Sequence, residues 1–215
     1  MTIMQEFEAR KLVAVCTVEN VKDAVPMAEA LMRGGISAIE LTLRTPAGLD
    51  CIREIRKALP EVYIGAGTVL TPEQVVQAKD AGACFAVAPG TNVRVIQKAN
   101  EIGIPFGPGI FTPSDIEAAL ENGCRMLKYF PAASCGIKHL KAIAAPYKHL
   151  GIKFIPLGGV NIDNLAEMLS DPLIAAVGGS WLAKPAQIAE GKFDEIEAQA
   201  RAAAAVINSL KNNIK

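Results

Sequence analysis

The chain has 215 residues, and its 22 lysine and arginine residues balance 22 aspartate and glutamate residues, so the formal net charge is zero. This balance gives no electrostatic basis for nucleic-acid binding, and no stretch approaches the roughly 20 apolar residues of a membrane span. Hydrophobic residues make up 51% of the sequence but aromatic residues only 5%, so the core is expected to be aliphatic.

The predicted elements begin with a short helix over residues 2–10. Eight segments rich in aliphatic and β-branched residues follow, and we predict that they are strands. These segments are residues 12–18, 38–44, 62–69, 84–90, 105–111, 125–131, 153–160 and 175–181. Amphipathic segments with helical spacing separate them. The last segment, residues 186–213, is expected to be helical with a break near Gly191.

This alternation of strands and helices predicts a parallel sheet. Eight strand–helix units fit a (β/α)8 TIM barrel, and 215 residues is near the lower end of the usual range of about 200 to 400 residues. We therefore predict an α/β fold, a (β/α)8 TIM barrel, as a single domain over residues 1–215. A doubly wound open sheet is the alternative, but no glycine-rich turn follows the first strand.

Charged and polar side chains alternate with apolar ones in the second predicted strand. Glu40, Thr42 and Arg44 share one face, and the other face is aliphatic. Because the aliphatic face must meet the helices, the polar face is expected to point into the barrel. One interpretation is a structural Glu40–Arg44 ion pair. The other is a carboxylate that acts as acid and base, with an arginine that holds an anionic substrate.

A lysine interrupts the apolar run of the sixth predicted strand. Lys128 lies near the end of this strand, between Leu127 and Tyr129. An amine in an apolar surrounding can attack a carbonyl and form a Schiff base. The alternative is a lysine that points outward or reaches past its apolar neighbours to solvent. Lys153, at the start of its strand, is given no role.

Glycine pairs end the seventh and eighth predicted strands. The seventh ends in Gly158 and Gly159, and the eighth ends in Gly178, Gly179 and Ser180. In TIM barrels the loops after these two strands commonly bind phosphate through backbone N–H groups. The alternative is a pair of tight turns with no ligand.

Several kinds of site are not expected. The chain has two histidines, and its five cysteines form no CxxC pair. No zinc-ligand spacing, P-loop or dinucleotide fingerprint occurs, so neither a metal nor a cofactor is predicted. An odd number of cysteines suits reduced thiols, and the charged N-terminal residues do not suit a signal peptide. We expect a cytoplasmic protein with a small-molecule substrate and no nucleic-acid or membrane partner.

Seven short motifs together give the chain a family resemblance. They are ELTLRT (40–45), GAGTVL (65–70), APG (88–90), PGI (108–110), LKYFPA (127–132), LGGV (157–160) and GGSW (178–181). In this order they resemble the 2-dehydro-3-deoxy-6-phosphogluconate (KDPG) aldolases and the related 4-hydroxy-2-oxoglutarate (KHG) aldolases.

The resemblance implies a class I, metal-free aldolase on a (β/α)8 barrel, commonly a homotrimer. By position, Lys128 matches the Schiff-base lysine and Glu40 the general acid and base. The matching substrate-binding residues are Arg44 and Thr68 for the carboxylate, Pro89 and Phe130 for the apolar wall, and Gly158, Gly159, Gly179 and Ser180 for the phosphate.

The sequence also departs from the family pattern beside the site. Leu157 replaces a frequent threonine, Phe111 replaces a small polar residue, and residues 133–137 replace a Glu-x-x-Gly-Gly segment. These changes leave the sugar acid open among 6-phosphogluconate, 6-phosphogalactonate, unphosphorylated and amino-sugar derivatives. Two other functions also stay open: a phosphate-binding barrel enzyme without covalent chemistry, and a paralogue that only binds a sugar phosphate.

Overall fold

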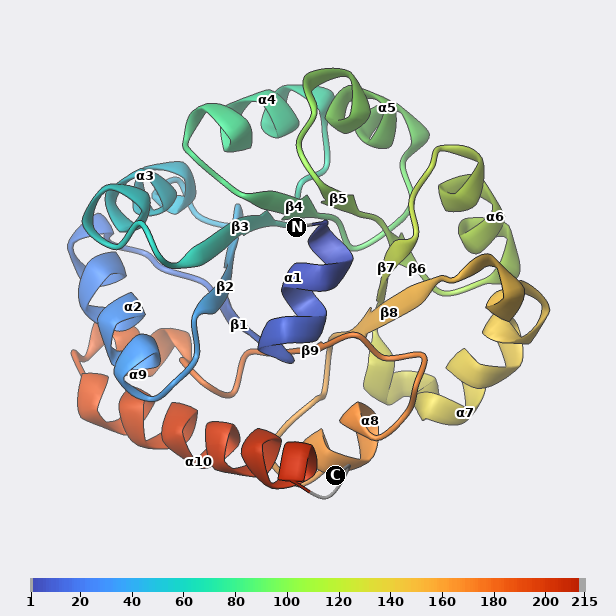
Figure 1. The fold of residues 1–215 in the computed structure, drawn as a ribbon. Coiled ribbons are helices and arrows are strands. Elements are labelled where there is room, and N and C mark those ends of the chain that lie inside the picture. The colour runs from blue at the N-terminus through green and yellow to red at the C-terminus, as the bar shows by residue number, and fades with distance from the viewer. Residues whose placement is uncertain (1, 213–215) are drawn as a thin grey trace.

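Short parallel strands curl around the centre of the molecule, and most of the helices lie outside them (Figure 1). This computed structural model describes residues 2–212. The strands are β1 (Leu12–Cys16), β2 (Ala38–Thr42), β3 (Tyr63–Gly67), β4 (Phe85–Val87), β5 (Phe106–Gly107), β6 (Gly109–Ile110), β7 (Met126–Tyr129), β8 (Lys153–Pro156) and β9 (Val177–Gly179).

The helices follow the strands in alternation, as predicted. They are α1 (Ile3–Arg10), α2 (Ala24–Arg33), α3 (Gly48–Ala58), α4 (Pro72–Asp80), α5 (Val93–Ile102), α6 (Pro113–Glu121), α7 (Ala132–Ala144), α8 (Leu165–Leu169), α9 (Pro185–Ala189) and α10 (Phe193–Asn212). Two 3₁₀ helices, η1 (Val21–Asp23) and η2 (Ala145–Leu150), complete the set in the described residues.

The strands belong to two parallel sheets. One has the order β5-β4-β3-β2-β1-β9, and the other has the order β6-β7-β8. Pro108 separates β5 from β6, and because proline has no N–H it cannot continue the ladder. At the other seam, two isolated bridges link the region of β8 to the region of β9: Phe154 pairs with Ile174, which precedes β9, and Leu157, which follows β8, pairs with Gly178. The predicted single sheet is therefore confirmed only as a curled parallel arrangement.

The observed strands are shorter than the predicted ones. The predicted strand 38–44 ends at Thr42, and the predicted strand 84–90 covers only β4, Phe85–Val87. The physical reason is that the residues at the C-terminal ends leave the ladder and form turns. Thr68, which directly follows β3, has a left-handed φ of +59°.

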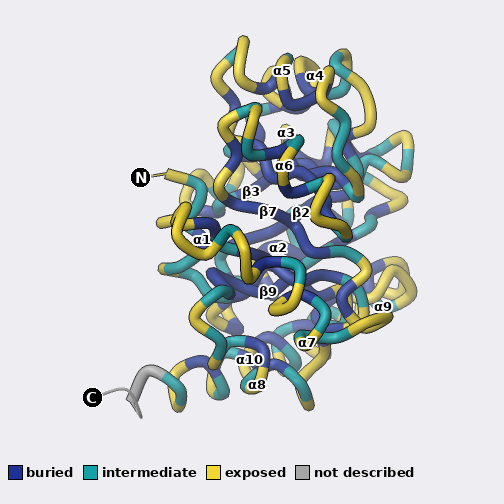
Figure 2. The backbone as a smooth tube through the Cα atoms, turned by 90° about the vertical axis from the view of Figure 1, so that its right-hand side faces the viewer, coloured by how far each residue is buried: buried dark blue, intermediate teal, exposed yellow. Residues whose placement is uncertain are grey.

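The outer faces of the strands pack against the helices to form an aliphatic core. Figure 2 shows buried positions along the strands and exposed positions mainly on the outer helices. In α3, the buried residues Cys51, Ile52 and Ile55 lie on one side of the helix. This spacing is the one expected for a helix that covers a sheet.

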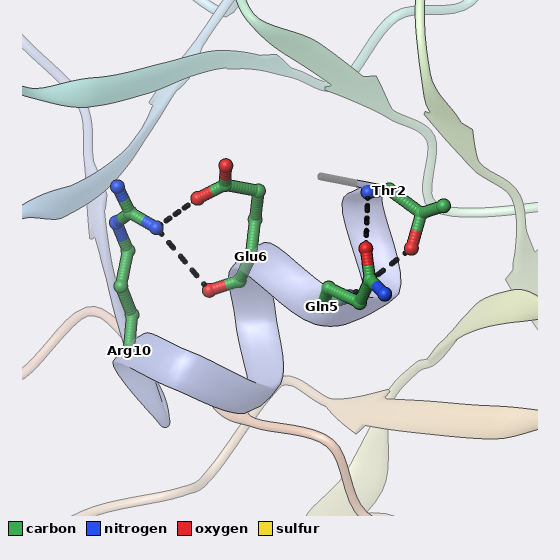
Figure 3. A network of polar contacts seen from close by, with 4 residues as sticks. All are labelled: Thr2, Gln5, Glu6 and Arg10. Carbon is green, nitrogen blue, oxygen red and sulfur yellow. Dashed lines mark hydrogen bonds and ion pairs between the residues drawn. The ribbon is translucent and has the colours of Figure 1, made fainter.

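Helix α1 lies against the N-terminal ends of the strands, so the predicted leading helix is confirmed. Its Phe7 is fully buried and packs edge-on against Phe85, with the ring centroids 5.0 Å apart. A capping box between Thr2 and Gln5 begins the helix, and an Arg10–Glu6 ion pair braces its last turn (Figure 3). With this end occupied, the C-terminal ends of the strands are left to form a site.

The C-terminal segment confirms the predicted break. Helix α9 ends at Ala189, Gly191 has a left-handed φ of +68°, and α10 begins at Phe193. The predicted last residue, 213, lies outside the described residues. None of the helices in residues 2–212 has the length and apolar character needed to cross a membrane.

Candidate active site

A buried ion pair lies among the strands. The Nζ atom of Lys128, on β7, donates a hydrogen bond of 2.9 Å to Oε1 of Glu40, on β2. The two side chains are only 4% and 2% exposed. Because a buried pair of charges recovers its desolvation cost only in part, such a pair is weak evidence for stability and a reasonable candidate for function.

The pair excludes two of the interpretations left open by the sequence. Glu40 points inward as predicted, but its partner is Lys128, so a structural Glu40–Arg44 ion pair is wrong. Lys128 is 3% exposed, so a lysine that reaches out to solvent is also wrong. The adjacent residue on the same face, Thr42, is fully buried, and its Oγ1 lies 2.8 Å from Oγ1 of Thr17.

The neighbouring strand makes room for the carboxylate of Glu40. A Cβ atom placed on Gly67, in β3, would lie 2.1 Å from Oε1 of Glu40. No real Cβ makes a contact that short, so only glycine at this position leaves the carboxylate its present place beside Lys128.

Arg44 lies at the rim of the site, just beyond the end of β2. Its Nε donates a hydrogen bond of 3.1 Å to Oγ1 of Thr68. Thr68 has a φ of +59°, which is strained for a β-branched residue. Backbone strain of this kind is concentrated at functional sites. The two residues predicted to hold a carboxylate are therefore in contact with each other.

A cavity of about 150 Å³ lies directly beside the ion pair. Its lining residues come from the strands or from the turns that follow them. They are Val15, Arg44, Lys128, Phe130, Leu157, Gly158, Gly178 and Ser180. The ring of Phe130 has its centroid 5.8 Å from Nζ of Lys128. The cavity thus brings an amine, a guanidinium, an apolar wall and a glycine-rich turn together.

Some of the predicted site residues do not line this cavity. Thr68 reaches it only through Arg44. Pro89 packs over Gly109: a Cβ atom added to Gly109 would lie 2.2 Å from the carbonyl carbon of Pro89. Gly179 faces Trp181, and Gly159 faces Ala133.

Val15 is a lining residue that was not predicted, and two others were given no binding role of their own. Leu157 was named only as a departure from the family pattern, and Gly178 only as a member of a glycine pair. A signal existed for Gly178, because the two-residue period of a strand allows only one glycine of the pair to face inward. Val15 could have been found from its position in the first strand, where it is the register partner of Glu40. Leu157 lies directly before the glycine pair.

The glycine turns leave backbone donors open. Within residues 2–212, the N–H groups of Gly159 and Ser180 donate no hydrogen bond to a backbone carbonyl of the turns and loops. Such donors suit an anion. In the same residue range, no group of three or more histidine, cysteine, aspartate or glutamate side chains is placed to hold a metal ion.

A thiol lies behind the acidic partner of the ion pair. Cys16, at the end of β1, is fully buried, and burial together with the negative charge of Glu40 raises its pKa far above the ordinary value. This thiol stays protonated in the folded protein, so it is not a nucleophile. This leaves the amine of Lys128 as the candidate nucleophile of the site.

Comparisons with known proteins place the chain among relatives along almost its whole length. The model of the KDPG and KHG aldolase family matches residues 3–199. A 2-dehydro-3-deoxy-phosphogluconate aldolase of Treponema pallidum is 43% identical over 199 residues, which cover 92% of this chain and 94% of the relative.

Two solved structures extend the comparison to the fold. A KDPG aldolase of Legionella pneumophila, with pyruvate captured as a covalent carbinolamine intermediate, aligns with a TM-score of 0.90 and 36% identity, over 94% of this chain and 98% of its own. The aldolase of Zymomonas mobilis with 3-phosphoglycerate aligns with a TM-score of 0.85 and 33% identity, over 95% and 96%.

Proposed function

The chain belongs to the KDPG and KHG aldolase family, and from this premise we propose that it cleaves a 2-dehydro-3-deoxy-6-phospho-aldonate to pyruvate and glyceraldehyde 3-phosphate. The reaction is of class I, through a Schiff base and without a metal ion. The observation that carries the proposal is the buried contact of 2.9 Å between Lys128 and Glu40. This contact supports a mechanism in which an amine and a neighbouring acid–base group act on the same carbonyl.

In this proposal Lys128 and Glu40 share the chemistry. Glu40 takes a proton from Nζ of Lys128, and the neutral amine attacks C2 of the 2-oxo acid. Glu40 then returns this proton to the hydroxyl of the carbinolamine, which leaves as water and gives an iminium ion. Glu40 then takes the proton of the C4 hydroxyl while the C3–C4 bond breaks and its electron pair moves into the iminium. The aldehyde leaves, Glu40 returns a proton to C3 of the enamine, and water hydrolyses the imine to release pyruvate.

The remaining residues bind and orient the substrate. Arg44 and Thr68 hold the carboxylate, so C2 is presented to the amine in a fixed geometry. Phe130 and Pro89 form the apolar wall. Gly158, Gly159, Gly179 and Ser180 bind the phosphate, which the open N–H groups of Gly159 and Ser180 support. The same site is proposed to cleave 4-hydroxy-2-oxoglutarate to pyruvate and glyoxylate.

A substrate panel tests the proposed function. Pyruvate release is measured with the 6-phosphogluconate and 6-phosphogalactonate derivatives and with 4-hydroxy-2-oxoglutarate. Lys128→Met should abolish release, whereas Lys153→Met, at the start of β8 and bonded to the Pro172 carbonyl, should retain it. Turnover that survives in Lys128→Gln would instead favour a barrel enzyme without covalent chemistry.

We also propose that the two sheets together form one (β/α)8 barrel and that this barrel is a single domain. Pro108 alone separates β5 from β6, and its carbonyl accepts a hydrogen bond of 2.8 Å from the N–H of Lys128. At the other seam, the N–H of Phe154 donates to the Leu173 carbonyl at 2.8 Å, and the N–H of Ala175 donates to the Phe154 carbonyl at 2.9 Å. These bonds support closure on both sides.

We also propose that the protein is a homotrimer and that it is located in the cytoplasm. Large apolar side chains at Leu70, Val76 and Val93 are exposed and could be covered by a second copy. Light scattering of the purified protein should give three times the 22.7 kDa of one chain. A mass of one chain would refute the trimer. The cytoplasm suits the five free thiols.

A further inference from the structure

A cluster of three rings lies on the face of β7 opposite to the catalytic amine. Tyr129 follows Lys128 in the strand, so its side chain points the other way, and it is 1% exposed. Its ring stacks on Phe111 with centroids 5.9 Å apart, and Phe111 also lies 4.8 Å from the ring of His139. The proposed chemistry uses none of these three side chains.

The hydroxyl of Tyr129 forms a hydrogen bond at a break in helix α7. This helix is interrupted at Gly136, whose φ of +67° and ψ of −177° are not helical. A break leaves backbone carbonyls without their helical partners. The Tyr129 hydroxyl donates a hydrogen bond of 3.2 Å to the Gly136 carbonyl and lies 3.0 Å from Nδ1 of His139. Since a hydroxyl has one hydrogen to donate, Nδ1–H of His139 is the donor in the second contact.

The other end of the same turn touches the substrate cavity. The N–H of Ala132 donates to the Leu157 carbonyl at 2.7 Å, and the N–H of Ala133 donates to the Gly158 carbonyl at 2.8 Å. Ala133 also packs closely on Gly159. A Cβ atom added to Gly159 would lie 2.2 Å from the Cβ of Ala133. Residues 132–136 therefore connect the Tyr129 hydroxyl with the Leu157–Gly158–Gly159 wall, of which Leu157 and Gly158 line the cavity and Gly159 packs against Ala133.

We propose that Tyr129, held by Phe111 and His139, is a positioning residue for the phosphate end of the substrate. It holds the first turn of α7 in place, and that turn holds the Leu157–Gly158–Gly159 wall through two backbone hydrogen bonds. Loss of the Tyr129 hydroxyl makes the Leu157–Gly158–Gly159 wall more mobile and leaves the position of Lys128 unchanged. The inference rests on the proposed role of this wall in binding phosphate.

The test is Tyr129→Phe, with Tyr147→Phe as the matched control. The Tyr147 hydroxyl donates to Glu117 on the exposed surface at 2.7 Å, so each variant loses one hydroxyl, with one hydrogen bond lost at Tyr147 and two at Tyr129. Tyr129→Phe should raise KM for the phosphorylated substrate about three- to tenfold, the loss expected for one hydrogen bond. The value of kcat and the borohydride trapping of pyruvate should stay within twofold of the wild type, and Tyr147→Phe should change neither.

His139 gives a second perturbation. His139→Leu removes the donor to the Tyr129 hydroxyl and should raise KM in the same way. His139→Asn keeps an N–H donor near the position of Nδ1 and should restore most of the affinity. If the two variants behave alike, the hydrogen bond has no positioning role and the inference is wrong.

Amide hydrogen exchange on the full chain separates this inference from the proposed function. In Tyr129→Phe, peptides that span residues 131–138 should exchange faster than in the wild type, while peptides from α3 should not change. If the wild type cleaves no phosphorylated substrate, the proposed function is wrong. The exchange result still tests whether the Tyr129 hydroxyl holds the first turn of α7 in place. Unchanged exchange, unchanged KM, or a loss confined to kcat and pyruvate trapping would each overturn the inference.

Discussion

Gly67→Ala is the substitution that tests the catalytic geometry most selectively. The new Cβ would lie 2.1 Å from Oε1, 2.6 Å from Cγ and 2.7 Å from Cδ of Glu40, and real Cβ contacts stay above 3.0 Å. The carboxylate must therefore withdraw by about 0.9 Å, which breaks its contact of 2.9 Å with Lys128. A displacement of about 1 Å in a catalytic group costs roughly 10²-fold in rate.

Gly65→Ala is the matched control in the same strand. Its Cβ would lie 2.3 Å from the ring of Phe85, so both variants introduce one methyl group into a filled space. Each should lose about 1–3 kcal/mol of stability, or roughly 2–4 °C in Tm per kcal/mol. Only Gly67→Ala should also lose about 10²-fold in kcat for pyruvate release. Equal losses of kcat in the two variants, or none in Gly67→Ala, would refute the reasoning.

Three further predictions concern the substrate carboxylate, the thiols and metals. Arg44→Lys should raise KM for the 2-oxo acid about tenfold, because an ammonium group cannot both hold Thr68 and bind a carboxylate in bidentate fashion; an unchanged KM would contradict this role. Burial raises the pKa of Cys51 and of Cys124 from 9.0 to about 11. Since the unfolded chain loses these protons first, Tm should fall as the pH rises from 9 to 11, and substitution of both cysteines by alanine should flatten that slope. Preincubation with a chelator should leave the rate of pyruvate release unchanged, and a loss that a divalent metal restores would contradict the metal-free reaction.

Much of the fold could be predicted because strand and helix patterns repeat along the whole chain. The two-residue period of β2 also predicted that Glu40 points inward, whereas burial of Lys128 was only one of two interpretations of its apolar neighbours. The pairing of these two residues could not be predicted, because they are 88 positions apart and Arg44 was the nearer cation. Only the packing of β7 across from β2 brings them together.

The finer errors have local causes. Pro108 has no N–H, so one predicted strand is divided between two sheets. Gly178 rather than Gly179 lines the cavity, and this depends on the register of the three-residue strand β9. The cluster of Phe111, Tyr129 and His139 was not expected, because its members come from the turn after β6, from β7 and from α7, and its effect depends on a helix break at Gly136.

The covalent role of Lys128 is the central claim, and borohydride trapping tests it most directly. The protein is incubated with pyruvate, reduced with borohydride and digested, and the modified peptide is identified by mass spectrometry. The account predicts one adduct, on Lys128, and none in Lys128→Met, while Lys153→Met is labelled like the wild type. A folded wild-type protein that forms no adduct, or forms it on another lysine, would contradict the account.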